Sequence, residues 1–299
     1  PLEPRLGRMV ILAISFGCLD PILNIVVSLG YRDPFLIPLD NKSRNECNAA
    51  KLKFSGNTNS DHLCNIFALK EYENVVKSRR DGGVFSFCRK HHLSSSTMRM
   101  IYGMKKQVLD NLYTLRLLPG PSVGYAWKFS NRYALRPDVI KSVVAAGLYP
   151  NILRRGAGEK NFQGRGNRKC RVQKNAVANL PGGALTVSKT PTGTFVWITF
   201  GEMLKGDRSE LVRDATVLSP YSILFCTGSA CSNIDADGSF QDSDEDGEDN
   251  AADQETPDSA TISIDDSIQF KVPIDLRQSI EFLRTISVHG AVEATITGD

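Results

Sequence analysis

Two apolar segments near the start of the chain, joined across a single break, constrain its fold more than any other feature. Their apolar residues are Met9, Ile11, Leu12, Ile14, Phe16, Ile22, Leu23, Ile25, Val26 and Leu29. These spacings would wrap most of a helix surface, so both segments are predicted to form buried helices. Asp20 and Pro21 mark the break, because Asp can cap a helix and Pro is tolerated at its first position. Asp33 precedes Pro34 and is predicted to end the second helix, since that position disfavours the α region.

The first half of the chain is predicted to be helical throughout. Helical spacing of apolar residues continues over the ranges 41–54, 60–78, 81–92 and 94–112. Ser60, Asp81 and Ser94 stand where these helices begin and are available as N-caps. Residues 113–136 include a Pro-Gly-Pro sequence and have no sustained period, which indicates a connector.

The pattern changes after residue 136. A short helix is predicted over 137–149, and the apolar residues then follow period two in short runs broken by Gly and Pro. The predicted strands are 171–178, 184–188, 195–204, 210–218, 221–226 and 262–270. Several short strands with turns indicate a small barrel. A final helix over 274–287 would cover it with the stripe Leu276, Ile280, Leu283 and Ile286.

Aromatic residues on the predicted strands are candidates for stacking on nucleobases. They are Phe195, Trp197, Phe200, Tyr221 and Phe225. Because alternate residues of a strand face opposite sides, half or more of these rings are expected in the core. The sequence therefore does not single out one stacking residue.

The formal net charge of +3 hides two opposite charge blocks. Residues 235–258 contain eleven acidic residues and no Lys or Arg, which leaves 36 basic against 22 acidic residues elsewhere. The acidic block has part of the spacing of an EF-hand calcium loop. However, Asp249 and Asp253 stand where an apolar residue and a bidentate Glu are required. A solvated, disordered insertion at about 232–260 is the favoured interpretation.

The basic block lies among glycines in the second half of the chain. Its members are Arg154, Arg155, Lys160, Arg165, Arg168, Lys169, Arg171 and Lys174. Arginine offers fork-shaped donors that suit phosphate, so this block is the candidate nucleic-acid-binding surface. The alternative is an ordinary solvated loop. On the predicted helix 94–112, Arg99, Lys105 and Lys106 lie away from the apolar stripe, and a wet surface is the simplest interpretation there.

Several site classes are excluded by the sequence. No G-x-x-x-x-G-K-[ST] loop, D-E-x-H box or G-x-S-x-G elbow is present, so no catalytic residue, cofactor site or metal site is predicted. Seven scattered cysteines without a C-x-x-C pair favour buried, reduced thiols in an intracellular, reducing compartment. No apolar run is long enough to span a membrane, and no membrane partner is predicted. His62 is interpreted as a hydrogen-bonding residue at a helix start.

Five motifs in register carry a resemblance to a known family. They are Leu6 to Met9 with Cys18-Leu19-Asp20-Pro21 and Asp33-Pro34-Phe35; Ser60-Asp61-His62-Leu63; Phe87-Cys88 with His92-Leu93; Ala145 to Pro150; and Val217 to Phe225. This arrangement resembles the helicase-associated, ratchet-like domain and the region after it in DEAH/RHA-type ATP-dependent RNA helicases. In the third motif, Phe87 occupies the position where the family has Trp, and His92 occupies the position where it has an aromatic residue.

The resemblance implies an α+β fold, with an all-helical ratchet-like domain at 1–115, a linker at 116–136 and an oligonucleotide-binding (OB) barrel with flanking helices at 137–299. It implies an accessory module that closes the RNA channel and holds single-stranded RNA during 3′ to 5′ translocation. It also gives the basic face of helix 94–112 a possible ligand, because ratchet helices line one wall of that channel.

The chain begins at Pro1, at a point that matches the middle of the family's C-terminal half, so we expect it to be part of a longer protein. The enzymatic activity would belong to that parent protein, whose motor domains would use ATP and Mg²⁺. Expected partners are single-stranded or structured RNA, those motor domains and a glycine-patch-type regulator. The alternative function is a non-enzymatic docking module that recruits regulatory proteins. Nucleus, cytoplasm and organelle are not distinguished.

Overall fold

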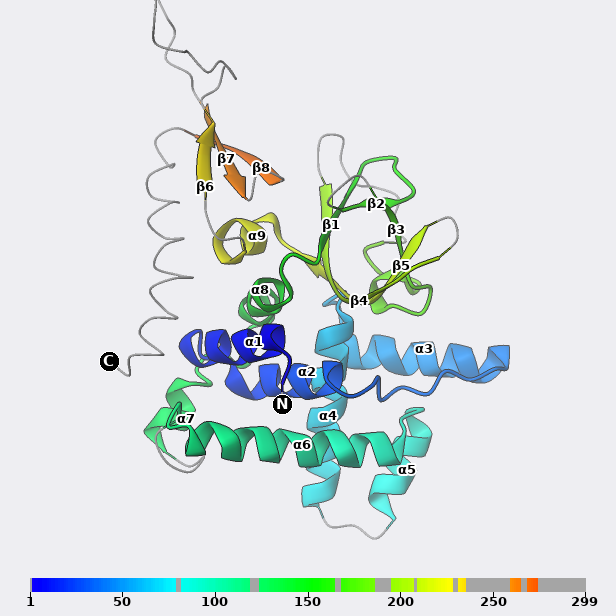
Figure 1. Cartoon of the computed structure of the whole chain (residues 1–299). Coiled ribbons are helices and arrows are strands. Elements are labelled where there is room, and N and C mark those ends of the chain that lie inside the picture. The colour runs from blue at the N-terminus through cyan, green and yellow to red at the C-terminus, as the bar shows by residue number, and fades with distance from the viewer. Residues whose placement is uncertain are drawn as a thin grey trace, which may run out of the picture.

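Helices from the N-terminal half carry a β-barrel built by the C-terminal half (Figure 1). The computed structural model describes residues 2–273 except 79–81, 119–123, 165–167, 186–194, 207–208, 228–230, 235–258 and 265–267. The helical and barrel parts of the predicted α+β fold are therefore confirmed. Within the described residues, no helix combines the length and apolarity needed to cross a membrane.

The first two helices, α1 (Pro4–Ser15) and α2 (Leu19–Leu29), are buried as predicted and form the centre of the largest apolar core. The break lies earlier than the sequence indicated. Gly17 adopts a φ of +66°, which glycine reaches at little cost, and α2 then begins at Leu19. Asp20 is therefore inside the first turn and is not the cap. Its backbone N–H instead donates to Asn131 Oδ1 at 2.7 Å.

Four helices follow and confirm the predicted periodicity: α3 (Asn41–Ser55), α4 (Asp61–Lys77), α5 (Gly83–Lys90) and α6 (Ser95–Thr114). Ser60 and Ser94 cap α4 and α6, because their hydroxyls accept from the N–H groups three residues ahead. The start of α5 was predicted wrongly. Gly82 occupies its N-cap position in the left-handed conformation, and Asp81 lies outside the described residues.

The predicted connector contains a five-residue helix, α7 (Tyr125–Phe129), and α8 (Pro137–Leu148) follows where expected. Helix α8 packs closely on α1. A Cβ atom on Gly147 would lie 2.7 Å from the side chain of Met9, so only glycine fits this crossing. Helix α8 thereby joins the helical core to the strands that follow.

The barrel comprises β1 (Ile152–Gly156), β2 (Phe162–Gln163), β3 (Lys169–Val172), β4 (Phe195–Leu204) and β5 (Glu210–Leu218). It closes in the order β1-β2-β3-β5-β4, with β3 and β5 parallel and the other pairs antiparallel. Five strands closed in this way match the expected small OB-type barrel. Its interior is filled by alternate residues such as Leu153, Phe162, Ile198, Phe200 and Val212.

The strand predictions succeeded for β4 and β5 and failed elsewhere in the barrel. The predicted strand 171–178 ends at Val172 and continues into a 3₁₀ turn, Val177–Asn179. Residues 184 and 185 form a turn, and the rest of the predicted strand 184–188 lies outside the described residues. The strands β1 and β2 were not predicted.

The range 221–226 was predicted as a strand but forms α9 (Pro220–Cys226). Ser219 caps this helix by accepting from the N–H of Tyr221, and proline is favoured at its first position. A separate sheet, β6 (Cys231–Ile234), β7 (Ser259–Ile264) and β8 (Ile268–Pro273), follows in that order. The ends of the predicted insertion are therefore paired strands. Residues 235–258 and the predicted helix 274–287 are outside the described residues.

Candidate nucleic-acid interface

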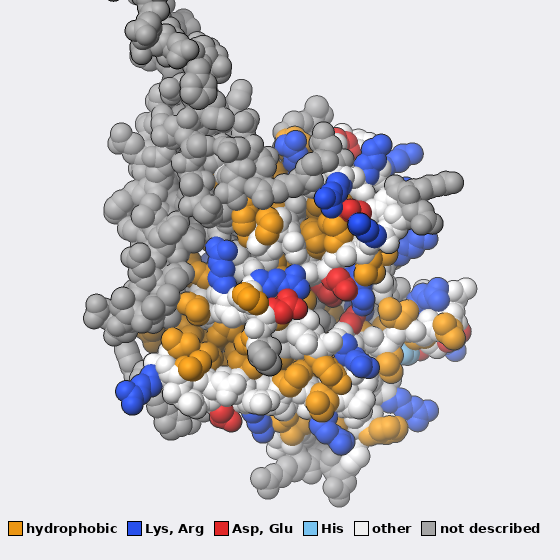
Figure 2. Space-filling view, viewed as in Figure 1, with side chains coloured by type: hydrophobic (Ala, Val, Ile, Leu, Met, Phe, Trp, Pro, Cys, Tyr) orange, Lys and Arg blue, Asp and Glu red, His pale blue; other side chains and the backbone are white. Residues whose placement is uncertain are grey.

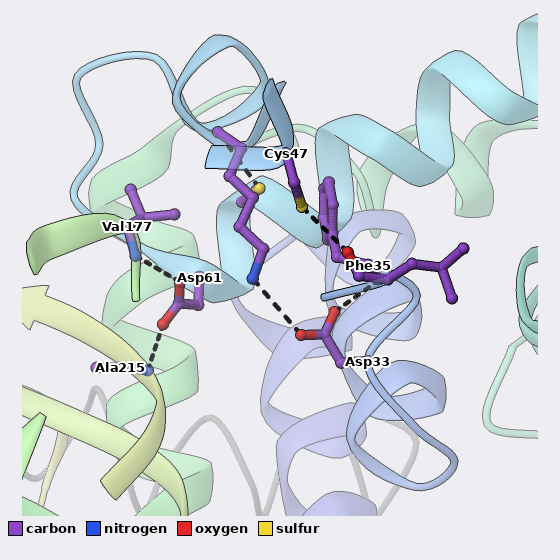
Figure 3. Close-up of polar contacts among 9 residues, drawn as sticks. Asp33, Phe35, Cys47, Asp61, Val177 and Ala215 are labelled. Carbon is purple, nitrogen blue, oxygen red and sulfur yellow. Dashed lines mark hydrogen bonds and ion pairs between the residues drawn. The ribbon is translucent and has the colours of Figure 1, made fainter. Parts of the chain in front are cut away.

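The start of α4 fastens the helices to the barrel at a seam that we define by residues 59–62 and their barrel partners (Figure 3). Asp61 accepts two backbone hydrogen bonds from the barrel side, from Val177 N–H at 2.8 Å and Ala215 N–H at 2.9 Å. On either side of Asp61, the Ser60 hydroxyl and His62 Nδ1 each lie 2.6 Å from Thr216 Oγ1. This motif therefore sets the position of the barrel. The interpretation of His62 as a hydrogen-bonding residue agrees with these contacts.

Buried charges surround the seam. Lys51 Nζ lies 3.6 Å from Asp33 Oδ2 (Figure 3). Burial lowers the pKa of Lys51, but the carboxylates of Asp33 and Asp61 outweigh it and hold the pKa above its ordinary value. Burial raises the pKa of Asp61, and the pKa of Asp214 rises to about 7 through burial and its carboxylate neighbours. The cavity among these groups measures about 10 Å³, which leaves no room for a substrate.

The raised pKa of Asp214 predicts that its contribution to the stability of the fold increases as pH falls. Its pKa is about 7 in the fold against 3.8 ordinarily, so the fold loses stability as pH rises from about 4 to 7. Asp214 has a φ of +54°, a region that asparagine tolerates. We expect Asp214→Asn to raise the free energy of unfolding by about 2 kcal/mol at pH 8, since solvent moderates the larger shift implied by the pKa. Little change is expected at pH 4.

Urea denaturation at the two pH values checks this prediction. Asp110→Asn supplies the matched control, because Asp110 is exposed on α6. If Asp110→Asn raises the free energy of unfolding at pH 8 by the same amount, the effect does not come from the seam.

A row of outward side chains crosses the barrel. Arg154 pairs with Gln163, Gln163 pairs with Lys169, and Arg154 also pairs with Trp197 on β4. Because their strand neighbours fill the barrel interior, these four side chains face away from it, but Trp197 is only 6% exposed and packs with Ile152 and Leu218 in a separate apolar core. The Arg154 guanidinium lies 5.1 Å from the centroid of the Phe195 ring, which is 46% exposed. We call the three polar members, Arg154, Gln163 and Lys169, the outer row. Figure 2 shows Lys and Arg side chains gathered over the barrel.

Other members of the basic block differ in how available they are. Arg155 is half-buried, stacks over Phe162 and donates to the Leu185 carbonyl, and burial lowers its pKa. Arg168 forms an ion pair with Glu210 at 3.3 Å. The remaining described members are exposed, namely Lys160, Arg171 and Lys174. Arg165 lies outside the described residues.

Helix α6 presents fewer cations than its sequence indicated. Lys105 was placed on a wet face, but its side chain is buried and its ammonium lies 2.7 Å from Asp20 and 2.8 Å from Glu73. It therefore supports the helix packing and is not offered to a ligand. Arg99 and Lys106 are exposed on this helix.

The candidate aromatic residues also separate by burial. Trp197 and Phe200 are buried, whereas Phe195 and Tyr221 are exposed. Tyr221 lies on α9 and not on a strand, and the Phe225 side chain is outside the described residues. Phe195 is thus the exposed ring beside an outer-row cation.

No cluster of three or more His, Cys, Asp or Glu residues suited to a metal ion occurs in the described part of the chain. The seam is the main feature that sequence reasoning missed. Its four charged residues, Asp33, Lys51, Asp61 and Asp214, are far apart in sequence. Within the seam, the helix cap Ser60 and the first helical residue Asp61 were the signal that could have pointed there.

Comparison with known proteins gives consistent matches. Residues 3–64 match the family described as "Helicase associated domain (HA2), ratchet-like". DExH-box ATP-dependent RNA helicase DExH1 of Arabidopsis thaliana is 30% identical over 233 residues, which are 76% of this chain and 21% of that protein. ATP-dependent RNA helicase DHX30 of Homo sapiens is 30% identical over 227 residues, 75% of this chain and 19% of that protein.

ATP-dependent DNA/RNA helicase DHX36 of Bos taurus is 30% identical over 288 residues, which are 95% of this chain and 25% of that protein. The chain thus spans between 19% and 25% of the length of these three relatives. The similarity to the first two covers about three quarters of the chain and therefore extends well beyond the matched family domain.

Proposed function

This chain belongs to the DEAH/DExH-box ATP-dependent RNA helicases and carries their helicase-associated, ratchet-like domain, and from this premise we propose that it holds single-stranded RNA for the motor of its parent protein. The parent would hydrolyse ATP with Mg²⁺ in motor domains, and this module would close the RNA channel during 3′ to 5′ movement. The module itself would contribute binding and no catalytic residue.

The observation that carries the proposal is the outer row with its neighbouring ring. Arg154 and Lys169 present positive charge on one side of the barrel, and Arg171 is exposed two residues beyond Lys169 on β3. Phe195 adds an exposed ring beside Arg154. Single-strand binders combine such cations for the phosphates with rings for the bases. Arg99 and Lys106 would supply charge on the helical wall.

Charge reversal on this surface should weaken RNA binding. We expect the triple variant Arg154→Glu, Lys169→Glu and Arg171→Glu to bind oligouridine about thirty-fold more weakly at low salt. Each phosphate contact on a single strand contributes about 0.7 to the salt slope, so three lost contacts should reduce that slope by about 2. Fluorescence anisotropy over a series of salt concentrations measures both quantities.

The matched control reverses three exposed lysines elsewhere, with Lys42→Glu, Lys70→Glu and Lys128→Glu. Both variants change the net charge equally, so only a contact-specific effect distinguishes them. Equal weakening in both variants would show general attraction and would overturn the proposed site.

A protein-docking role is the second candidate, and the turn after α2 favours it. Leu36 and Ile37 are each more than half exposed there, and Leu39 is 95% exposed. Such apolar residues fit a protein partner better than a phosphate chain. Absent or salt-insensitive RNA binding by the wild type would favour this role. A glycine-patch-type regulator remains a prediction for such a partner.

We also propose that the protein works in a reducing, intracellular compartment. Support comes from five described cysteines that are buried thiols outside any disulfide, namely Cys18, Cys47, Cys64, Cys88 and Cys170. Burial raises the pKa of Cys18 to about 12 and that of Cys170 to about 11, which keeps both thiols protonated and unreactive.

A further inference from the structure

A second pocket lies among α3, α4 and α5, away from the outer row. Its volume is about 520 Å³, within the range of ligand pockets. Phe54, Phe67, Phe87 and His91 supply its aromatic lining. Nothing in the barrel mechanism uses this pocket, so its chemistry requires a separate explanation.

Three of its rings form one cluster. The centroid of His91 lies 5.0 Å from that of Phe54 and 4.8 Å from that of Phe87, with tilted planes. Phe54 is buried, whereas Phe87 and His91 are half-exposed. The cluster therefore has a fixed base and two rings that reach the opening. Such rings offer stacking surface to a planar ligand.

The charge around the cluster is mainly positive. Burial lowers the pKa of His91, and the cations of Lys90 and Lys53 lower it further, while Glu71 alone opposes them. Lys53 and Glu71 both line the pocket, Lys90 lies next to His91 in the chain, and both lysines are exposed. Planar aromatic surface beside two exposed ammonium groups complements a ligand that is both planar and anionic. A nucleotide has this combination, whereas an aromatic peptide side chain lacks the anion.

The pocket is also next to the seam. Thr58 lines it, and the following residue, Asn59, accepts from the barrel N–H of Ala184 at 2.8 Å. We propose that the pocket binds one nucleobase of single-stranded RNA, with Phe87 and His91 against the base and with Lys53 and Lys90 supplying charge for the phosphates. This inference rests on the proposed RNA-binding function and adds a base-binding site to it.

Substitution of Phe87 should separate stacking from packing. Phe87→Leu keeps an apolar side chain and removes the ring, and Phe87→Tyr keeps the ring. Stacking on one aromatic side chain accounts for several-fold to a hundred-fold of single-strand affinity. We expect Phe87→Leu to bind an oligoadenylate containing 2-aminopurine about ten-fold more weakly and to lose the quenching of its fluorescence. Phe87→Tyr should behave as the wild type.

Phe85→Leu is the matched control, because Phe85 is on the same helix, is 67% exposed and does not line the pocket. It should leave affinity and quenching unchanged. The double variant Lys53→Glu and Lys90→Glu provides a second test on exposed positions that does not disturb the core, and it should also weaken binding. Equal behaviour of Phe87→Leu and Phe85→Leu would overturn the inference.

A second experiment distinguishes failure of the pocket proposal from failure of the barrel proposal. It follows binding of adenosine monophosphate by NMR saturation transfer, with ribose 5-phosphate as the comparison ligand that lacks a base. Saturation transfer to the protons of the adenine base that is lost in Phe87→Leu would support the pocket even if the chain bound no oligonucleotide. In that case only the barrel proposal would fail. Salt-sensitive oligonucleotide binding without any effect of Phe87→Leu on quenching or transfer would retain the barrel proposal and reject the pocket. Displacement of the probe by an uncharged phenylalanine peptide more readily than by adenosine monophosphate would identify a peptide site instead.

Discussion

Asp61→Ala is expected to lower the free energy of unfolding by about 4 kcal/mol at pH 7, as measured by urea denaturation. The carboxylate accepts from the buried N–H groups of Val177 and Ala215, which belong to the barrel side of the seam. Alanine would leave both donors without this acceptor, at about 1–3 kcal/mol each. It would also remove a negative charge that stabilises the ammonium of buried Lys51.

Asp40→Ala is the matched control for this prediction. Asp40 also stands at a helix start and accepts from Ser43 N–H at 2.7 Å, but it is exposed and this bond joins it to the first turn of its own helix. Asp40→Ala should therefore lower the free energy of unfolding by much less than Asp61→Ala. Asp61→Asn should fall between the two, because an amide oxygen can still accept. Similar losses for Asp61→Ala and Asp40→Ala would show that the seam does not depend on this carboxylate.

Amide hydrogen exchange gives an independent measurement at the same seam. In Asp61→Ala, the amides of Val177 and Ala215 should exchange faster, whereas the amide of Ser43 should not change. In Asp40→Ala the pattern should be reversed. A uniform acceleration in both variants would indicate general destabilisation without a local role for Asp61.

Local sequence signals were sufficient for the helices and for two strands. The helix α4 combines apolar periodicity with Ser60 as its cap, and both signals lie within the helix itself. The strands β4 and β5 are runs of ten and nine residues that contain several β-branched and aromatic side chains, so a strand is indicated without knowledge of their partners. The elements that were predicted are therefore the long ones whose sequence signals lie within the element itself.

Short elements depend on contacts that the sequence does not show. The strand β2 has only two residues and exists because it pairs with β1 and β3. The helix α9 is apolar enough to be a strand, and only Ser219 before it and Pro220 at its first position indicate a helix. Such a short apolar run does not distinguish the two structures.

The candidate site divides in the same way. The basic block was visible as composition, but the availability of each cation depends on partners elsewhere in the chain. Lys105 is neutralised by Asp20 and Glu73, which lie 85 and 32 residues away in sequence. The outer row depends on strand register, since Arg154 and Lys169 share a face through Gln163 on the short strand β2. Register and pairing therefore decide which charges can contact RNA.

Acid should destabilise the fold through His62. This ring is buried at the seam, with Nδ1 2.6 Å from Thr216 Oγ1, and its Nε2 has no hydrogen-bond partner among the described residues. Burial lowers the pKa of His62 to about 4, against about 6.5 in the unfolded chain. Between these values the unfolded state binds the additional proton, so the stability due to this group is complete above pH 6.5 and is lost as pH falls toward 4. This difference corresponds to about 3 kcal/mol.

The variant His62→Asn isolates this contribution. Asparagine places a polar atom near the position of Nδ1 and does not titrate. The free energy of unfolding of the variant should therefore vary by about 3 kcal/mol less than that of the wild type between pH 7 and pH 4. His92→Asn is the matched control, because His92 follows α5 and its Nε2 lies 3.5 Å from Glu46 Oε2, not at the seam. Subtracting each variant's curve from that of the wild type also removes the opposite contribution of Asp214, which is common to all three proteins. If His62→Asn and the wild type lose the same stability on acidification, the buried imidazole is not the group that makes the seam sensitive to acid.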